Sequence, residues 1–257
     1  MPPISATIIT RNEAQHIGRA IRSLSFADEI VVVDAESTDA TRDIAASLGA
    51  QVVVHPWAGF AAQKNYASQL ANHDWILSLD ADEELDEAAQ EAVRLWKTLE
   101  PGSPGYRFVR RARYLGRWIL HSGWYPDYKV RLFDRRRGEW QGAYVHESVV
   151  VRGAVETLPG EILHYTCDSL ADQHERIEFY TDLAAQELYD RGERPARLWR
   201  VLGPPAAFVR SFIFHLGVLD GYQGFLIAWM AARYVRRKQA KFAQKFAAAK
   251  SAGANLS

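Results

Sequence analysis

Apolar and polar residues alternate in blocks along the first hundred residues of the chain. Short apolar runs at residues 4–9, 30–33, 52–54 and 75–79 are each followed by a segment with helical spacing. A continuously apolar run is typical of a strand that is covered on both faces, as in a parallel sheet. Strands and helices that alternate in this way favour right-handed βαβ units. The pattern therefore predicts an α/β fold, with a mostly parallel sheet flanked by helices.

The pattern changes after Pro104. Shorter apolar runs, which predict shorter strands, follow at residues 130–133, 145–151 and 161–165. Residues 169–189 have helical spacing, and Pro204-Pro205 predicts a break in the chain. We therefore expect two domains, a sheet domain at residues 1–168 and a helical C-terminal region at residues 169–257.

Polar side chains, most of them carboxylates, follow the ends of three predicted strands: Asn12 and Glu13, then Asp34 and Glu36, then Asp80 and Asp82. The carboxyl ends of parallel strands meet at one edge of the sheet, where open α/β sheets bind ligands. Asp80 and Asp82 offer the oxygen ligands that Mg²⁺ and Mn²⁺ prefer. The alternative is a surface turn whose acidic residues favour the start of the next helix. The convergence of all three clusters favours a ligand site with a divalent ion.

A nucleotide diphosphate suits this edge of the sheet. Carboxylates at the first two strand ends would accept hydrogen bonds from ribose hydroxyls and from the edge of a uracil base. A metal at Asp80 and Asp82 would neutralise the diphosphate. Gln63, Lys64 and Asn65, in the helix before the fourth strand, add one cation and two amides near the same ligand. For Lys64 the alternative is an ordinary solvated helix position.

Four motifs resemble, in the same order, those of family 2 glycosyltransferases. They are residues 10–13 (TRNE), 33–39 (VDAESTD), 63–65 (QKN) and 79–83 (LDADE), within a resemblance that covers about residues 4–150. The resemblance implies the GT-A fold, which is Rossmann-like, and inversion at the anomeric carbon. It also implies that Asp34 contacts the base of a UDP-sugar and that Asp80-Ala81-Asp82 is the metal-binding DxD motif. Glu36 departs from the family, which has glycine at that position.

A narrower resemblance is to bacterial lipopolysaccharide inner-core β-1,4-glucosyltransferases. It is carried by residues 124–133 (WYPDYKVRLF), 145–147 (VHE) and 217–221 (GVLDG). It implies transfer of glucose to a lipid-linked acceptor. Enzymes that act on capsule, exopolysaccharide or polyprenyl-phosphate acceptors carry similar pieces and stay as alternatives. Two further alternatives are a nucleotidyltransferase, which typically has a glycine-rich basic first loop that is absent here, and a non-catalytic nucleotide-sugar-binding protein.

An inverting transfer needs a base for the acceptor hydroxyl and positive charge for the departing diphosphate. Asp127 and Glu147 are the candidates for the base, and the resemblance of the segment around Asp127 to the family's base region favours Asp127. Lys129 and Arg131 would hold the diphosphate or a phosphorylated acceptor, with a solvated strand edge as the alternative. The residues predicted to bind the donor are Thr10, Asn12, Glu13, Asp34, Glu36, Gln63, Lys64, Asp80 and Arg131.

The predicted metal ligands are Asp80, Asp82 and a histidine. His146 or His164 would complete the metal shell, and the alternative for each is a hydrogen-bonded structural residue. The expected cofactor is Mg²⁺ or Mn²⁺.

Charge is unevenly distributed along the chain. The 257 residues have a net charge of zero, but from Arg191 onward twelve lysines and arginines face two acids, so this region carries +10 and the preceding residues −10. A basic end on an acidic body predicts an anionic surface as partner. Nucleic acid is disfavoured because the basic tail has few aromatic residues after Tyr234 and no known reader motif.

The C-terminal region predicts contact with a membrane surface. Residues 208–235 contain Arg210, His215 and Asp220, and the longest clean run, 225–232, is too short to cross a bilayer. An aromatic-rich segment followed by basic residues is typical of an interfacial element on anionic lipid. The alternative is a core helix with a solvated basic terminus.

The expected cellular compartment follows from the first ten residues and from the cysteine content. Residues 1–10 lack the basic flank and the cleavage site of a signal peptide. The single cysteine, Cys167, excludes an intrachain disulfide, which agrees with a reducing compartment. We therefore expect a cytoplasmic protein that is peripheral on the cytoplasmic face of the inner membrane.

Overall fold

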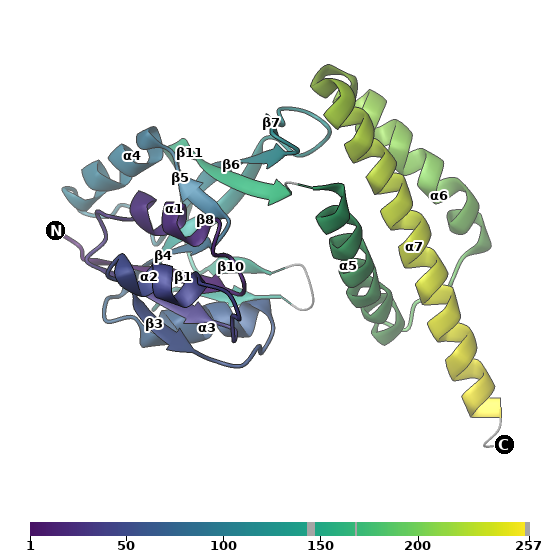
Figure 1. Cartoon of the computed structure of the whole chain (residues 1–257), viewed down its shortest axis with the longest axis horizontal. Helices are drawn as coiled ribbons and strands as arrows, with labels where there is room; N and C mark the ends of the chain where they lie inside the picture. Colours follow the sequence, from purple (N-terminus) through teal and green to yellow (C-terminus); the bar gives the residue numbers. More distant parts are fainter. Residues whose placement is uncertain (143–146, 168, 255–257) are drawn as a thin grey trace. The chain divides into compact units, whose positions relative to one another are not determined.

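The computed structural model describes residues 1–142, 147–167 and 169–254. The chain forms two compact units, each shown in Figure 1. The sheet unit comprises residues 1–112 and 126–166, and the helical unit comprises residues 113–125 and 167–257. A division of the chain by function near residue 168 stays a prediction.

Four parallel strands form the first half of the main sheet. In spatial order they are β3 (Gln51–Val54), β2 (Glu29–Asp34), β1 (Ile4–Thr10) and β4 (Trp75–Asp80). All seven residues of the central strand β1 are buried, because the sheet is covered on both faces. This half of the sheet is the parallel α/β arrangement that the apolar runs predict.

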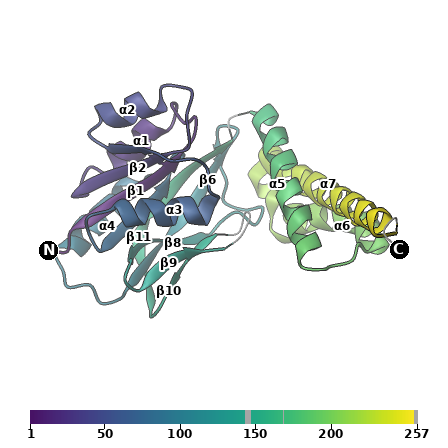
Figure 2. The same cartoon turned by 90° about the horizontal axis from the view of Figure 1, so that it is seen from below.

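Helices cover the two faces of the parallel strands. They are α1 (Ile17–Ser23), α2 (Thr41–Ser47), α3 (Phe60–Leu70) and α4 (Glu87–Lys97). Ile8 packs in one core with α1, α2 and α4, whereas its neighbour Ile9 packs in another with α3, because successive side chains of a strand point to opposite faces. Helices α1 and α2 lie side by side (Figure 1 and Figure 2).

The second half of the sheet is largely antiparallel. Beyond β4 it continues with β8 (Asp127–Asp134), β6 (Gly105–Tyr114), β11 (Val155–Cys167) and β5 (Glu83–Leu85), and β7 (Arg117–Trp118) pairs with β6. A separate hairpin is formed by β9 (Gly138–Gln141) and β10 (Ser148–Val151). No crossover helix separates the strands from β6 to β11, and strands joined directly pair antiparallel. The α/β prediction is confirmed, as a mixed sheet whose parallel part is limited to the first four strands.

The helical unit is built on α7 (Gly221–Ala254), which packs against α5 (Leu170–Asp190) and α6 (Arg197–Val209). A π-helix (Arg210–Phe214) and a 3₁₀-helix (Gly217–Asp220) join α6 to α7 (Figure 1).

The predicted break at Pro204-Pro205 is wrong, because both prolines lie inside α6. Proline removes one backbone donor, but its fixed φ is close to the helical value. The carbonyls that lose their donors belong to Arg200 and Val201, which are exposed, so water can satisfy them.

Asp220 fixes the start of α7. Its buried carboxylate accepts hydrogen bonds from the backbone N–H groups of Leu120 and His121, at 3.2 and 3.1 Å, and from the Ser122 hydroxyl at 2.9 Å. A Cβ on Gly224 would lie 1.8 Å from the carbonyl oxygen of Gly217, so the close approach of these two segments requires glycine.

Among the described residues no single helix combines the length and apolar character needed to cross a bilayer. The helical segments Arg197–Phe214 and Gly217–Ala249 are joined by a bend of 74°. Taken together, this pair has the length and apolar composition needed to cross a bilayer.

Candidate active site

The carboxyl ends of β1, β2 and β4 lie side by side in the sheet. The strand registers pair Thr10 with Asp34 and Ile9 with Asp80. Residues that are far apart in the sequence therefore meet at one sheet edge, which is the edge where open α/β sheets bind ligands.

Asp34, at the end of β2, is fully buried and held by the loop that follows it. Its carboxylate accepts a hydrogen bond from the Ser37 backbone N–H at 2.8 Å and another from the Ser37 hydroxyl. The Ser37 hydroxyl also accepts from the backbone N–H of Asn12 at 2.8 Å, so the loops after β1 and β2 are joined. Thr10 Oγ1 is buried and has no hydrogen-bond partner among the described residues. A buried hydroxyl of this kind is suited to a ligand that supplies the missing partner.

Both loops contain a non-glycine residue in the left-handed backbone region. Asn12 has φ 54° and Glu36 has φ 58°. Asparagine tolerates this conformation well, and the side-chain oxygen of Asn12 accepts from the Thr38 backbone N–H at 2.8 Å. The Glu36 side chain is exposed, and the backbone N–H of Glu13 donates to Thr41 Oγ1 at 2.8 Å. These contacts fix the shape of the loops around Asp34.

Charged side chains form a continuous chain of alternating sign within the sheet unit. We refer to this set as the charge chain, in the order Glu147, Lys64, Asp80, Arg131, Glu83, Arg110 and Asp127. The two candidate bases, Glu147 and Asp127, occupy its two ends.

The first half of the charge chain surrounds Asp80. Lys64 Nζ lies 2.8 Å from Asp80 Oδ1 and 3.1 Å from Glu147 Oε1, and Arg131 Nη2 lies 2.9 Å from Asp80 Oδ2. The ring of Trp140 lies beside both cations, with its centroid 4.3 Å from Lys64 Nζ and 5.5 Å from Arg131 Cζ. Asp80 therefore has one cation on each carboxylate oxygen.

The second half links Glu83 to Asp127. Arg131 Nη2 donates to Glu83 at 2.7 Å, and Arg110 Nη1 lies 3.0 Å from the same carboxylate. Arg110 also donates twice to Asp127 Oδ2, at 3.0 and 2.7 Å, while Lys129 Nζ lies 3.1 Å from Asp127 Oδ1. This fork fixes the orientation of the Asp127 carboxylate.

Much of the charge chain is removed from water. Lys64 and Glu83 are each 1% exposed and Arg131 is 3% exposed. Burial would raise the pKa of the Asp80 carboxyl, but Lys64 and Arg131 outweigh burial and hold that pKa well below its usual range. Burial would likewise lower the pKa of Arg131, and Glu83 and Asp80 raise it above its ordinary value. Asp80 and Arg131 therefore each favour the charged form of the other, as buried ions require.

A β-bulge aims Arg131 into this site. The register between β6 and β8 shifts between Tyr106, which pairs with Leu132, and Arg107, which pairs with Val130, so Arg131 has no opposite residue on β6. Bulges re-aim side chains and occur often beside active sites.

Asp82 follows the end of β4 and faces His164 on β11, with Oδ2 and Nε2 3.3 Å apart. Two ligand atoms that each lie about 2.1 Å from one ion can be this far apart, and carboxylate and imidazole both bind Mn²⁺. Among the described residues no group of three or more His, Cys, Asp and Glu side chains is arranged to hold a metal. The pair fits a metal whose other ligands come from substrate and water. His146 lies outside the described residues.

Gln63 has a structural contact. Its side chain donates to the His55 carbonyl at 3.2 Å and lies 3.1 Å from His55 Nδ1, which ties α3 to the end of β3.

Sequence reasoning gave no role to Glu83, Arg110 or Trp140. Glu83 is the last residue of the DADE motif at residues 80–83. Its position next to Asp82, a predicted metal ligand, was the signal in the sequence that could have identified it as a site residue. Arg110 and Trp140 lie outside every motif, and only strand pairing brings them to the site.

Comparison with known proteins agrees with this fold. The family model "Glycosyl transferase family 2" matches residues 5–158. The chain is 31% identical to the lipopolysaccharide core biosynthesis glycosyltransferase LpsC of Rhizobium meliloti, over 95% of this chain and 93% of that protein. It is 32% identical to an uncharacterized glycosyltransferase of Rickettsia bellii, over 91% and 84% of the two chains.

Among solved structures, the mannosyltransferase PcManGT of Pyrobaculum calidifontis, in complex with GDP-Man and Mn²⁺, aligns with a TM-score of 0.52. The identity is 15%, over 94% of this chain and 87% of that chain, so this likeness concerns the fold alone. The sheet unit has the GT-A fold that the four motifs predict. The chain belongs to glycosyltransferase family 2.

Proposed function

We propose that this glycosyltransferase moves a sugar, with glucose as the first candidate, from a UDP-sugar to a lipid-linked acceptor such as the lipopolysaccharide core, with inversion. The observation that carries the proposal is the charge chain, in which Asp80 lies between Lys64 and Arg131 at the end of β4. Two buried cations at a sheet edge are suited to a diphosphate, and a carboxylate between them holds them in place before the donor binds.

The donor nucleoside is assigned to the loops after β1 and β2. Asp34 is positioned to accept hydrogen bonds from the base, and Thr10 Oγ1 has hydrogen-bonding capacity left over. Asn12, Glu13 and Glu36 form the rim of the same loops. PcManGT, which shares this fold, is found in complex with GDP-Man, and this supports a nucleotide-sugar donor.

A divalent ion, Mg²⁺ or Mn²⁺, is assigned to Asp82 and His164, with Asp80 beside it in the DxD motif. When bound, the ion supplies positive charge to the departing diphosphate. Lys64 and Arg131 act on the same charge from the protein side. Of the two histidines predicted as the further ligand, we propose His164, because its Nε2 faces Asp82. His146 stays the other candidate.

Asp127 is assigned as the base that takes the proton of the acceptor hydroxyl. The acceptor oxygen then bonds to the anomeric carbon as the bond from that carbon to the diphosphate breaks. The fork of Arg110 holds Asp127 in one orientation, and positioning is a large part of such catalysis. Glu147, at the other end of the charge chain, is the alternative base.

The acceptor and the membrane are assigned from two observations. LpsC, a relative over nearly the whole chain, is named for lipopolysaccharide core biosynthesis. The region from Arg191 carries ten net positive charges, which suits an anionic membrane surface. The proposed location is the cytoplasmic face of the inner membrane, with no nucleic-acid partner.

A donor screen tests the proposal. The full chain is incubated with Mg²⁺ or Mn²⁺ and a set of nucleoside diphosphate sugars, and free nucleoside diphosphate is measured without and with a lipopolysaccharide core acceptor. We expect slow release from a UDP-sugar alone and faster release with acceptor. Donor binding without any release would indicate a non-catalytic binding protein. Pyrophosphate release from a nucleoside triphosphate would indicate a nucleotidyltransferase instead.

A further inference from the structure

Exposed apolar side chains gather on one part of the helical unit. More than half of the large hydrophobic residues that the structure exposes lie between Leu198 and Trp229, on α6, the two short helices and the start of α7. Phe214 is 76% exposed, Val201 71% and Leu198 70%. Apolar patches of this extent mark interaction sites.

The exposed residues follow helical spacing. On α6 and the π-helix they recur at Leu198, Leu202, Val209 and Ile213, and on α7 they recur at Tyr222, Phe225 and Trp229. Intervals of three, four and seven residues place side chains on one face of a helix. The rings of Phe208 and Phe212 lie 5.8 and 6.1 Å from that of Phe225, so an aromatic cluster joins the two helices. We call the exposed large hydrophobic residues of α6, the two short helices and the start of α7 the apolar face; they include Leu198, Phe214, Leu219 and Trp229.

The segments that bear the apolar face are poor in acidic residues. From Arg194 to the end of the sequence Asp220 is the only acidic residue, and it is 2% exposed and used in hydrogen bonds within the unit. Beyond Trp229, α7 continues with Arg233, Arg236, Arg237 and Lys238. Arg237 pairs with Glu178 of α5 at 2.9 Å. An apolar, aromatic surface that continues into a net basic segment is complementary to anionic lipid.

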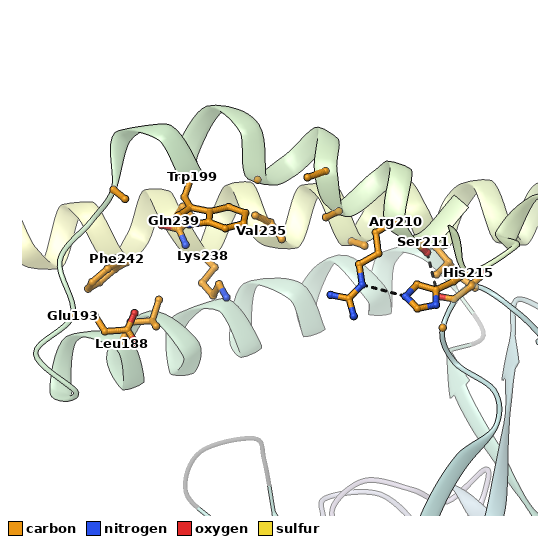
Figure 3. Close-up of a pocket in the computed structure, with 18 of the residues that line it drawn as sticks. Leu188, Glu193, Trp199, Arg210, Ser211, His215, Val235, Lys238, Gln239 and Phe242 are labelled. Atoms are coloured by element: carbon orange, nitrogen blue, oxygen red, sulfur yellow. Dashed lines mark hydrogen bonds between the residues drawn. The ribbon is translucent and has the colours of Figure 1, made fainter. Parts of the chain in front are cut away.

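A cavity of about 690 Å³ in the same unit has a related lining. Small and apolar residues, Gly203 and Ala207 among them, form much of its wall. Its charged lining residues include Arg210, Lys238 and Glu193 (Figure 3). Arg210 donates to His215 Nε2 at 3.1 Å.

We propose that the apolar face inserts into the interfacial layer of an anionic lipid bilayer, with its aliphatic and aromatic side chains among the acyl chains and the following basic residues at the headgroups. This inference rests on the membrane contact of the proposed function, names the apolar residues that enter the bilayer, and makes binding partly independent of charge. The assay below contains no sugar donor, so its outcome is separate from that of sugar transfer.

Vesicle flotation at low and high salt tests the insertion. The full chain is mixed with vesicles of phosphatidylcholine and phosphatidylglycerol, at low salt and at about 1 M salt, where charges are screened beyond about 3 Å. We expect part of the binding to survive high salt. Loss of all binding at high salt would show contact through charge alone and would overturn the proposal.

A matched pair of double variants locates the contact. Leu198→Ser with Leu219→Ser alters the apolar face, and Leu95→Ser with Leu99→Ser makes the same change at similarly exposed leucines of the sheet unit. We expect the first pair to lower the salt-resistant partition by about tenfold or more, because each leucine contributes apolar burial, and the second pair to leave it unchanged. Equal effects of both pairs would overturn the proposal.

A fluorescent label provides a readout that does not depend on a destabilising change. Phe214→Cys in a Cys167→Ser background carries an environment-sensitive dye, and we expect its emission to shift to shorter wavelength when vesicles are added. An unshifted emission would contradict insertion. A stable dimer in the absence of lipid that the Leu198→Ser, Leu219→Ser protein cannot form, together with no vesicle binding, would assign the apolar face to a second copy of this chain.

Discussion

The two units of this protein depart from the usual distribution of residues in opposite directions. The sheet unit buries charge, because Lys64, Glu83 and Arg131 are almost completely removed from water. The helical unit exposes apolar side chains, and Phe214 and Leu198 are examples that lie mostly in solvent. Buried ions are costly unless paired, and large exposed apolar patches are rare in monomeric proteins.

The difference matches the partner that we propose for each unit, an anionic donor for the sheet unit and a lipid surface for the helical unit. In the sheet unit every member of the charge chain has an oppositely charged neighbour, which keeps cations ready for an anionic ligand. In the helical unit basic residues follow the apolar face, and Asp220, the acid within the segments that form this face, is buried, which suits an anionic surface outside the protein. The sheet unit therefore has its charged groups buried, whereas the helical unit has its apolar groups on the surface.

The largest expected effect is on catalysis at the sheet edge. We expect Asp82→Ala to lower sugar transfer by on the order of a thousandfold or more, because the charge of a bound ion on the departing diphosphate is lost. Glu87→Ala, at an exposed position at the start of α4, is the matched control. Full activity of the Asp82→Ala protein in the presence of a chelator would exclude a metal role, and circular dichroism checks that both variants are folded.

The next largest effect concerns the catalytic base and distinguishes between the two candidates at the ends of the charge chain. We expect Asp127→Asn to reduce kcat by about 10²- to 10⁴-fold with little change in donor affinity, as for loss of a general base. Glu147→Gln is the paired variant, and steady-state kinetics with varied donor compare the two. Normal turnover with weak donor binding in Asp127→Asn, and the large kcat loss in Glu147→Gln instead, would transfer the base role to Glu147.

The sequence was sufficient for the parts of the site that come from parallel strands. The apolar runs place Asp34 and Asp80 at strand ends, and the rule that parallel strands share an edge brings them together without knowledge of the register. The same logic fails after Pro104, where pairing is antiparallel.

Arg110 reaches Asp127 only because β6 and β8 pair in one specific register, and Arg131 is aimed by a bulge. A one-residue shift would point these side chains to the other face, and the apolar pattern of these strands does not fix the register.

The predicted break at Pro204-Pro205 is wrong for a different reason. Proline lowers the stability of a helix, but exposed carbonyls one turn earlier limit the cost.

Stability distinguishes the two units. We expect Glu83→Gln to lower the free energy of unfolding by about 3–5 kcal/mol, because Arg131 and Arg110 would lose a buried counter-ion. Phe214→Ser should change it by no more than about 0.5 kcal/mol, because that side chain is exposed. Urea denaturation measures both. Equal losses in the two variants would remove the contrast between buried charge and exposed apolar surface.

The smallest expected effect is the pH dependence contributed by Asp80. Its folded pKa lies below that of the unfolded chain, so its stabilising contribution is present above the unfolded pKa of about 3.9 and is lost as pH falls through the folded value. Asp80→Asn should therefore be less stable than wild type by about 1–2 kcal/mol at pH 7. We expect this difference to shrink as the pH falls below about 4. A difference that is constant with pH in urea titrations would contradict the pairing with Lys64 and Arg131.

The central claim is that the charged edge of the sheet holds a donor diphosphate together with a divalent ion. Anomalous diffraction from crystals grown with UDP and Mn²⁺ tests it most directly. We expect one manganese peak in contact with Asp82 and His164, with the diphosphate beside Lys64 and Arg131. UDP bound elsewhere, or manganese bound away from both Asp82 and His164, would contradict it.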